Sequence, residues 1–119
     1  MIIGVPKEIK SDENRVGLLP VGAEQLVAAG HRVMVEAGGG IPSGARDDEY
    51  VSAGAILMQD PTAIYGEADL IIKVKEPLPQ EFTLLRPGQA IFCYFHFAAD
   101  RELTRAMLAR QIVAIAYET

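Results

Sequence analysis

Three residues of this 119-residue chain combine a useful side-chain chemistry with a useful place in the sequence: Arg15, Lys75 and His96. Arg15 lies in a charged segment, KEIKSDENRVGLLP, and a guanidinium fork is the natural bidentate partner of a carboxylate. Lys75 lies in IIKVKEP, where a desolvated lysine could polarise a carbonyl group. His96 follows the apolar run IFCYF, and an imidazole can exchange protons near neutral pH. Together these groups could bind and act on a small carboxylic acid.

Each of the three residues also has a plain structural interpretation. A charged loop such as the one that holds Arg15 is usually just solvated. A lysine near a strand end is usually solvated as well. His96 lies between Phe95 and Phe97 and could be a core histidine with one hydrogen-bond partner.

Lys73 and His31 also need a choice between a functional and a purely structural role. Strand alternation places Lys73 and Lys75 on one face, opposite Val74, so that one could face a site while the other faces solvent. His31 follows Gly30 at a helix-to-strand turn. We therefore expect His31 at the opposite edge of the sheet, without a chemical role.

The elements that must position these side chains alternate between strand and helix. Short apolar runs predict strands at residues 2–5, 32–36, 55–58, 70–74, 90–94 and 112–116. Helices are predicted at residues 20–29, 47–53, 61–66 and 100–110, from Pro at first positions, Gly at ends and the capping residue Asp100. This order predicts one α/β domain over residues 1–119, with the three-layer Rossmann-like (flavodoxin-like) architecture and a mainly parallel sheet.

A parallel sheet has a direct consequence for the three chemical residues. All three are predicted to follow the carboxyl ends of strands, and these ends meet at one edge of the sheet. Ligands of open α/β sheets bind beyond that edge. We therefore expect Arg15, Lys75 and His96 to converge there.

The glycines at 38, 39, 40 and 44 follow a predicted strand and invite comparison with a phosphate-binding loop. Their spacing does not fit G-x-G-x-x-G, and Pro42 stands where the helix should begin. A flexible surface loop is the favoured interpretation. No cofactor-binding residue is therefore predicted in this chain, and the single cysteine, Cys93, excludes an internal disulfide or a multi-cysteine metal site.

Composition excludes several classes of function. Half of the residues are hydrophobic and 23% are charged, which is the balance of a folded globular domain. The net charge of -5 and the absence of a basic stripe argue against a nucleic-acid partner. No apolar run has membrane-spanning length and no signal peptide is apparent, so we expect a cytoplasmic protein without a membrane partner.

Several stretches resemble one known family along the whole chain: GVPKEIK and ENRV, LVAAGHRVMVEAGGG, DLIIKVKEP, LLRPGQ, HFAADREL and IAYET. They are similar to the N-terminal part of alanine dehydrogenases. The proton-translocating transhydrogenases and the saccharopine-type lysine dehydrogenases share the opening and the glycine loop. The combination of KVKEP with Y-x-H-x-A-A-D separates alanine dehydrogenases from both.

The resemblance implies a role for each residue. Arg15 would bind the substrate carboxylate, Lys75 would contact the substrate and polarise its carbonyl or imine, and His96 would be the catalytic acid/base. The implied reaction is NAD-dependent oxidation of L-alanine to pyruvate and ammonia, in an enzyme that forms hexamers. NAD would be bound by a second domain, which is absent from this chain. A chain that ends directly after a strand fits that expectation, and the chain alone would be inactive.

Two features depart from the family pattern. Leu19 replaces the usual Thr or Ser before Pro20, where it would cap the helix, and Phe95 and Phe97 flank His96 where Leu is commoner. Two other functions therefore stay open: a stand-alone binding module for a small keto or amino acid, and a transhydrogenase-like domain with a vestigial site. The intact Arg15, Lys75 and His96 argue against a vestigial site.

Overall fold

The computed structural model describes residues 1–118 and contains one sheet of six parallel strands in the order β3-β2-β1-β4-β5-β6. This is the 3-2-1-4-5-6 order of Rossmann folds. The strands are β1 (Ile2–Val5), β2 (Arg32–Glu36), β3 (Ile56–Met58), β4 (Leu70–Lys75), β5 (Ala90–Tyr94) and β6 (Val113–Ala116). The helices are α1 (Pro20–Ala28), α2 (Asp47–Ser52), α3 (Pro61–Glu67), α4 (Pro79–Phe82) and α5 (Arg101–Ala109), with 3₁₀ turns η1 (Ile41–Ser43) and η2 (Phe97–Ala99).

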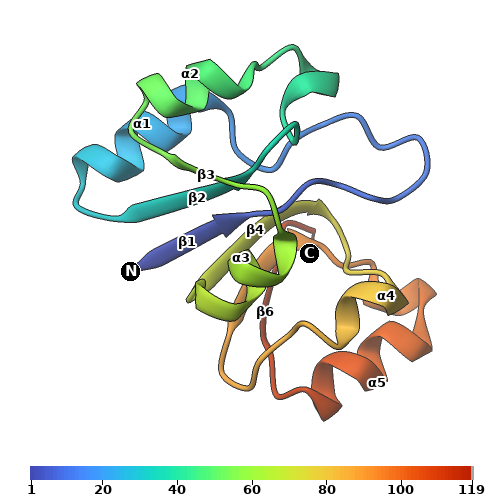
Figure 1. The fold of residues 1–119 in the computed structure, drawn as a ribbon. Coiled ribbons are helices and arrows are strands. Elements are labelled where there is room, and N and C mark those ends of the chain that lie inside the picture. Colours follow the sequence, from blue (N-terminus) through green and yellow to red (C-terminus); the bar gives the residue numbers. More distant parts are fainter. Residues whose placement is uncertain (119) are drawn as a thin grey trace.

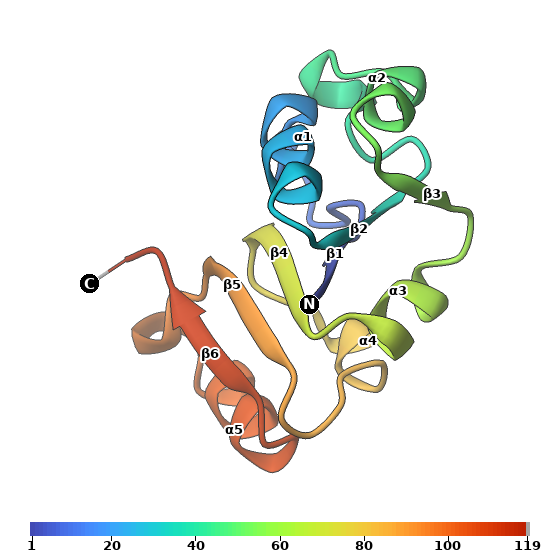
Figure 2. The ribbon, with the colours of Figure 1, turned by 90° about the vertical axis from the view of Figure 1, so that its left-hand side faces the viewer.

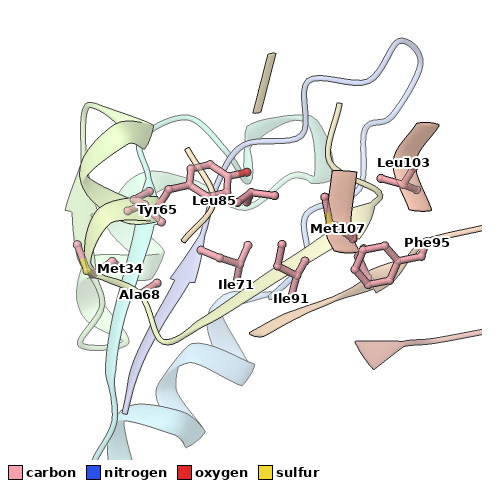
Figure 3. Packing of buried hydrophobic residues seen from close by; sticks show 11 residues of the cluster. Met34, Tyr65, Ala68, Ile71, Leu85, Ile91, Phe95, Leu103 and Met107 are labelled. Carbon is pink, nitrogen blue, oxygen red and sulfur yellow. The ribbon is translucent and has the colours of Figure 1, made fainter. Parts of the chain in front are cut away.

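The helices form a layer on each face of the sheet (Figures 1 and 2). Helices α1 and α2 cover β1 to β3 on one face. Their cluster of buried side chains comprises Ile3, Val5, Ala23, Val33, Val35, Ala45, Tyr50, Ala55 and Ile72. Helices α3 and α5 cover the other face, where Ile71, Ile91 and Phe95 from the sheet meet Leu103 and Met107 from α5 (Figure 3). The predicted three-layer Rossmann-like fold is confirmed.

The inner strands form where the apolar runs were predicted. β1 and β2 are each buried over three successive residues, because helices cover both of their faces. All six strands and four of the helices match the predictions to within two residues at each end. The predictions did not include α4, η1 and η2, which are each four residues or shorter.

The glycine segment differs from the predicted flexible surface loop. Gly39 and Gly40 are buried, and a Cβ on Gly40 would lie 2.7 Å from the ring of Tyr50 and 2.9 Å from the carbonyl oxygen of Ala45. Gly44 closes η1 with a φ of 84°, in the left-handed region that glycine enters without steric cost. The segment is therefore a packed turn, in which the small residues allow close approach to α2.

One part of the sheet has no helix over it in the described residues. On the face that carries α1, the strands β5 and β6 are left open, and all four residues of β6 are exposed (Figure 2). None of the helices described in residues 1–118 has the length and hydropathy needed to cross a membrane.

Helix α1 begins without a side-chain cap, which leads to a first prediction. Leu19 holds the N-cap position, makes no cap hydrogen bond and is 51% exposed. Leu19→Ser supplies an oxygen for an unpaired amide of the first turn, so we expect stability to rise by about 1 kcal/mol. Urea denaturation measures the change. Leu108→Ser on α5, where Leu108 is 74% exposed, is the matched control and should give no gain; an equal effect in both variants would contradict the capping argument.

Candidate functional site

The candidate site lies at the carboxyl edge of the sheet. β1 pairs with β2 on one side and with β4 on the other, so the strand order reverses there. Ligands of such sheets bind in the crevice beyond this reversal. The long segment after β1, residues 6–19, extends past the strand ends on this side (Figure 1). It brings Arg15 to the edge where Lys75 ends β4 and His96 follows β5.

Arg15 is held by a nearby carboxylate. Its Nε donates to Oε2 of Glu13 at 3.0 Å and its Nη2 to Oε1 at 2.9 Å, while its side chain stays 62% exposed. These hydrogen bonds hold the pKa of Glu13 below its usual value. Glu13 takes two of the five N–H donors of the guanidinium, which leaves three, two on Nη1 and one on Nη2, for a ligand carboxylate.

The backbone on both sides of Arg15 is fixed by Ser43, from the glycine segment. The Ser43 hydroxyl donates to the carbonyl oxygen of Asn14 at 2.7 Å and accepts from the amide of Val16 at 3.1 Å. Gly17 then passes close to β4, since a Cβ there would lie 2.7 Å from the carbonyl oxygen of Ile72. The packed glycine turn therefore has a positioning role that its residue types did not reveal.

The expectation that Lys73 and Lys75 share one face is wrong, because β4 contains a β-bulge. Ile72 pairs with Phe92 but Lys75 pairs with Tyr94, so two residues of β4 oppose one of β5. A one-residue shift of register reverses the face of every later side chain. Lys75 therefore falls on the Tyr94 side, and its charge is among those that lower the pKa of Glu13 beside Arg15.

Lys73 takes the other direction and enters the core. Its side chain is 1% exposed, and its ammonium lies 3.5 Å from Oε2 of Glu8 and 3.5 Å from Oε2 of Glu81. Glu81 also accepts from the hydroxyl of Tyr65 at 2.8 Å. A buried charge with two anionic partners serves the fold, since loss of one partner from a buried pair typically costs about 3–5 kcal/mol. Lys75, in contrast, is only partly buried.

His96 has an uncommon backbone conformation. Its φ of 55° and ψ of 44° lie in the left-handed region, which residues other than glycine rarely adopt. Its amide and that of Phe95 both donate to Glu118, at 2.9 and 3.1 Å. Its ring lies parallel to that of Tyr94, with 6.1 Å between centroids. This geometry directs the chain sharply away from β5 and into η2.

Two cavities adjoin these residues. One of about 360 Å³ is lined in part by Arg15, Lys73, Tyr94 and Tyr117. Another, of about 430 Å³, is lined in part by His96, Phe97 and Glu118. Arg15 and His96 therefore border different cavities. Lys75 lines neither of them, although its charge acts on Glu13 beside Arg15.

Tyr94 and Tyr117 lie at the candidate site and were not predicted as site residues. Both line the Arg15 cavity, and Tyr94 also stacks beside His96. Tyr117 stacks on Phe92 with 4.0 Å between centroids and lies 4.8 Å from the ring of Tyr94. Burial raises the pKa of Tyr117. The motif that contains His96 includes Tyr94, but no sequence signal marks Tyr117 as its neighbour.

His31 and Cys93 take no part in this edge. His31 follows α1 at the amino ends of the strands, where its Nδ1 lies 3.1 Å from the N-terminal amine of Met1. Cys93 is fully buried, and burial raises the pKa of its thiol, which disfavours the reactive thiolate. In residues 1–118 no three His, Cys, Asp or Glu side chains are placed to share a metal ion.

The described residues do not form a dinucleotide cradle. In Rossmann folds the phosphates lie against a tight glycine turn between the first strand and the first helix. Here residues 6–19 fill that connection, and Pro20 at the start of α1 has no amide hydrogen to donate. The carboxyl edge of the sheet instead offers a guanidinium, an ammonium and an imidazole. Such side chains could bind a small carboxylic acid and exchange protons with it.

Comparison with known families assigns this domain. Residues 4–119 match the model of the family "Alanine dehydrogenase/PNT, N-terminal domain". The chain belongs to this family.

Similar proteins agree with the family match. The chain is 50% identical over all of its 119 residues to an alanine dehydrogenase of Methanococcus maripaludis and 51% identical to one of Bacillus subtilis. It spans about a third of the length of these relatives, 32% and 31%. A solved L-alanine dehydrogenase superposes with a TM-score of 0.97 at 47% identity, covering 100% of this chain and 33% of that one. A transhydrogenase from Sinorhizobium meliloti superposes with 0.91 at 31% identity, covering 98% and 33%.

The role of Ser43 gives a second prediction. Ser43→Ala removes one donor and one acceptor that hold Asn14 and Val16, so we expect the Val16 amide to exchange with solvent roughly tenfold faster, at a cost of about 1 kcal/mol. Hydrogen exchange read by NMR measures it. Ser52→Ala on the exposed surface of α2 is the control. Equal Val16 protection in both variants would show that Ser43 does not hold the Arg15 loop.

Proposed function

We propose that this chain is the substrate-binding and catalytic part of an NAD-dependent L-alanine dehydrogenase. In the overall reaction L-alanine, NAD⁺ and water give pyruvate, ammonium, NADH and a proton. The observation that supports the proposal is the placement of Arg15, Lys75 and His96 at the carboxyl edge of the sheet, in a chain about 50% identical to alanine dehydrogenases.

Arg15 is the anchor for the substrate carboxylate in this proposal. Arg15 lines a cavity of about 360 Å³, which is ample for a three-carbon acid. Glu13 and Ser43 hold the guanidinium and its backbone before the substrate arrives. Such preorganisation lowers the entropy lost on binding.

Lys75 and His96 act on the reacting end of the substrate. Lys75 lies across the bulge from Lys73 and on the side of Tyr94, where its ammonium can hydrogen bond to the carbonyl or imine nitrogen and stabilise developing negative charge. His96 takes a proton from the attacking water and returns one to the leaving amine, since imidazole serves in both directions near neutral pH.

NAD is assigned to another part of the whole protein. The connection from β1 to α1 has no phosphate cradle, and the chain spans about a third of its relatives' length. Within this proposal residues 1–119 form a single substrate domain that is inactive alone. The full-length enzyme, expected in the cytoplasm, would be a homo-oligomer, a hexamer by family resemblance, since closed symmetric assemblies are the usual form of such enzymes.

A transhydrogenase-like domain is the second candidate, and the 0.91 TM-score favours it over an unrelated binding module. A vestigial site would have no need of the left-handed backbone that His96 adopts. The retained chemistry at the strand ends therefore favours the dehydrogenase.

Kinetics of the full-length enzyme test the proposed division of labour. The carboxylate is unchanged by the reaction, so Arg15→Ala should appear mainly as a raised KM for alanine. Protons move only during turnover, so His96→Ala should lower kcat by a factor on the order of 10²–10⁴. Lys75→Arg should not restore the activity lost in Lys75→Ala, because a planar fork does not replace a point charge.

Matched controls exist for two of these variants. Arg46 is an exposed arginine on the α2 side of the molecule, and His31 lies at the opposite sheet edge. Arg46→Ala and His31→Ala should leave both constants unchanged. Near-normal kcat for His96→Ala at saturating alanine would reduce His96 to a packing residue and remove the proposed mechanism.

Cofactor placement can be measured on the 119-residue chain itself. Because the β1–α1 connection provides no ring of amides for phosphates, calorimetric titration should detect no NAD binding in the micromolar range. The full-length enzyme provides the positive control. Micromolar affinity of the 119-residue chain would place the cofactor site in this domain after all.

A further inference from the structure

Two glutamates make the same contact at neighbouring strand ends. Oε2 of Glu8 accepts from the amide of Val74 at 3.1 Å, and Oε1 accepts from the amide of Lys75 at 3.0 Å. Oε1 of Glu118 accepts from the amide of Phe95 at 3.1 Å, and Oε2 accepts from the amide of His96 at 2.9 Å. In each case one carboxylate binds two successive amides, and the second amide belongs to a proposed site residue.

The strand ends need these contacts because both leave the regular ladder. β4 lies between β1 and β5. Its pairing with β1 ends at Ile71, and the bulge between Ile72 and Lys75 disturbs its pairing with β5, so the next two amides lie beyond the regular ladders. Beyond β5 the left-handed turn at His96 carries the chain away from the sheet. Backbone amides that lose a ladder partner require another acceptor. A carboxylate supplies two acceptors and forms the stronger, charge-assisted type of hydrogen bond.

The two glutamates reach these positions from different parts of the chain. Glu8 enters from the segment after β1, where it is buried and faces the ammonium of Lys73. Glu118 follows β6 and reaches across to the end of β5. Burial acts to raise the pKa of Glu118, but the amides of His96 and Phe95 outweigh it and lower that pKa overall. Glu118 is therefore held as the anion.

We propose that Glu8 and Glu118 are positioning residues, which fix the backbone of Lys75 and of His96 so that both side chains face the substrate. The inference rests on the proposed function for the roles of those side chains. Each carboxylate binds two backbone amides through its two oxygens, and neither glutamate is assigned a contact with the reacting atoms. Each acts through the residue whose amide it binds.

Glu118→Gln in the full-length enzyme is the principal test. The amide side chain keeps one acceptor and turns an N–H donor toward the second backbone amide, so the pair of contacts is lost at unchanged side-chain size. Glu49→Gln is the matched control, because Glu49 accepts one backbone amide, that of Arg46, at the start of α2. Peptide-resolved hydrogen exchange and steady-state kinetics are measured on both variants.

We expect exchange at residues 95–96 to accelerate about tenfold or more in Glu118→Gln and to stay unchanged in Glu49→Gln. kcat should fall roughly 10- to 100-fold through misplacement of His96, while KM for alanine stays within about twofold. Glu118→Asp, which keeps both acceptors on a shorter side chain, should recover part of kcat. A general loss of structure would instead change exchange throughout the domain and both kinetic constants.

Glu8→Gln tests the other contact, through faster exchange at residues 74–75 and a raised KM together with a lowered kcat. Because Glu8 also faces buried Lys73, the double variant Glu8→Gln/Lys73→Met is measured if the single variant does not fold. Unchanged hydrogen exchange in Glu118→Gln or in Glu8→Gln overturns the proposal. Faster exchange with normal kinetic constants overturns it as well. If the unmodified enzyme fails to oxidise alanine, the proposed function fails, and the exchange results still report separately whether the glutamates hold these amides.

Discussion

The carboxylate of Glu8 is the contact on which the arrangement of the site most depends. It satisfies the two amides released by the β4 bulge and balances the charge of Lys73 within the core. Without the bulge, Lys75 would point to the same side as Lys73. The buried carboxylate of Glu8 therefore stabilises the register shift in β4. The register shift in turn directs Lys73 and Lys75 to different sides of the strand.

The strand order explains why these contacts gather at one place. β1 and β4 lie side by side although some 65 residues of chain separate them, and the segments that leave their carboxyl ends diverge over opposite faces. Glu8, Glu13 and Arg15 all come from the segment after β1, while Lys73 and Lys75 come from the end of β4. The segment that follows β1 thus supplies both Arg15, the proposed anchor for a carboxylate, and Glu13, the acidic residue that pairs with it.

Sequence reasoning predicted local features well and non-local ones poorly. Pro20, Gly30 and the apolar runs indicated the elements, because capping and periodicity are encoded within a few residues. Parallel pairing then placed Arg15, Lys75 and His96 at one edge. The β4 bulge, the partner of His96 and the position of Ser43 were not predictable, since each depends on residues about 20 or more positions away. Alternation is a rule of regular strands, and this site is built where a strand stops being regular.

The open face of β5 and β6 has a clear place in this arrangement. Phe92, Tyr117, Tyr94 and His96 form a continuous row of rings, with centroids 4.0, 4.8 and 6.1 Å apart. Rings have few rotatable bonds, so such a row forms a stiff surface beside the Arg15 cavity, which Tyr94 and Tyr117 line. In the described part of the chain no helix covers these two strands on this face, so the row stays open next to that cavity.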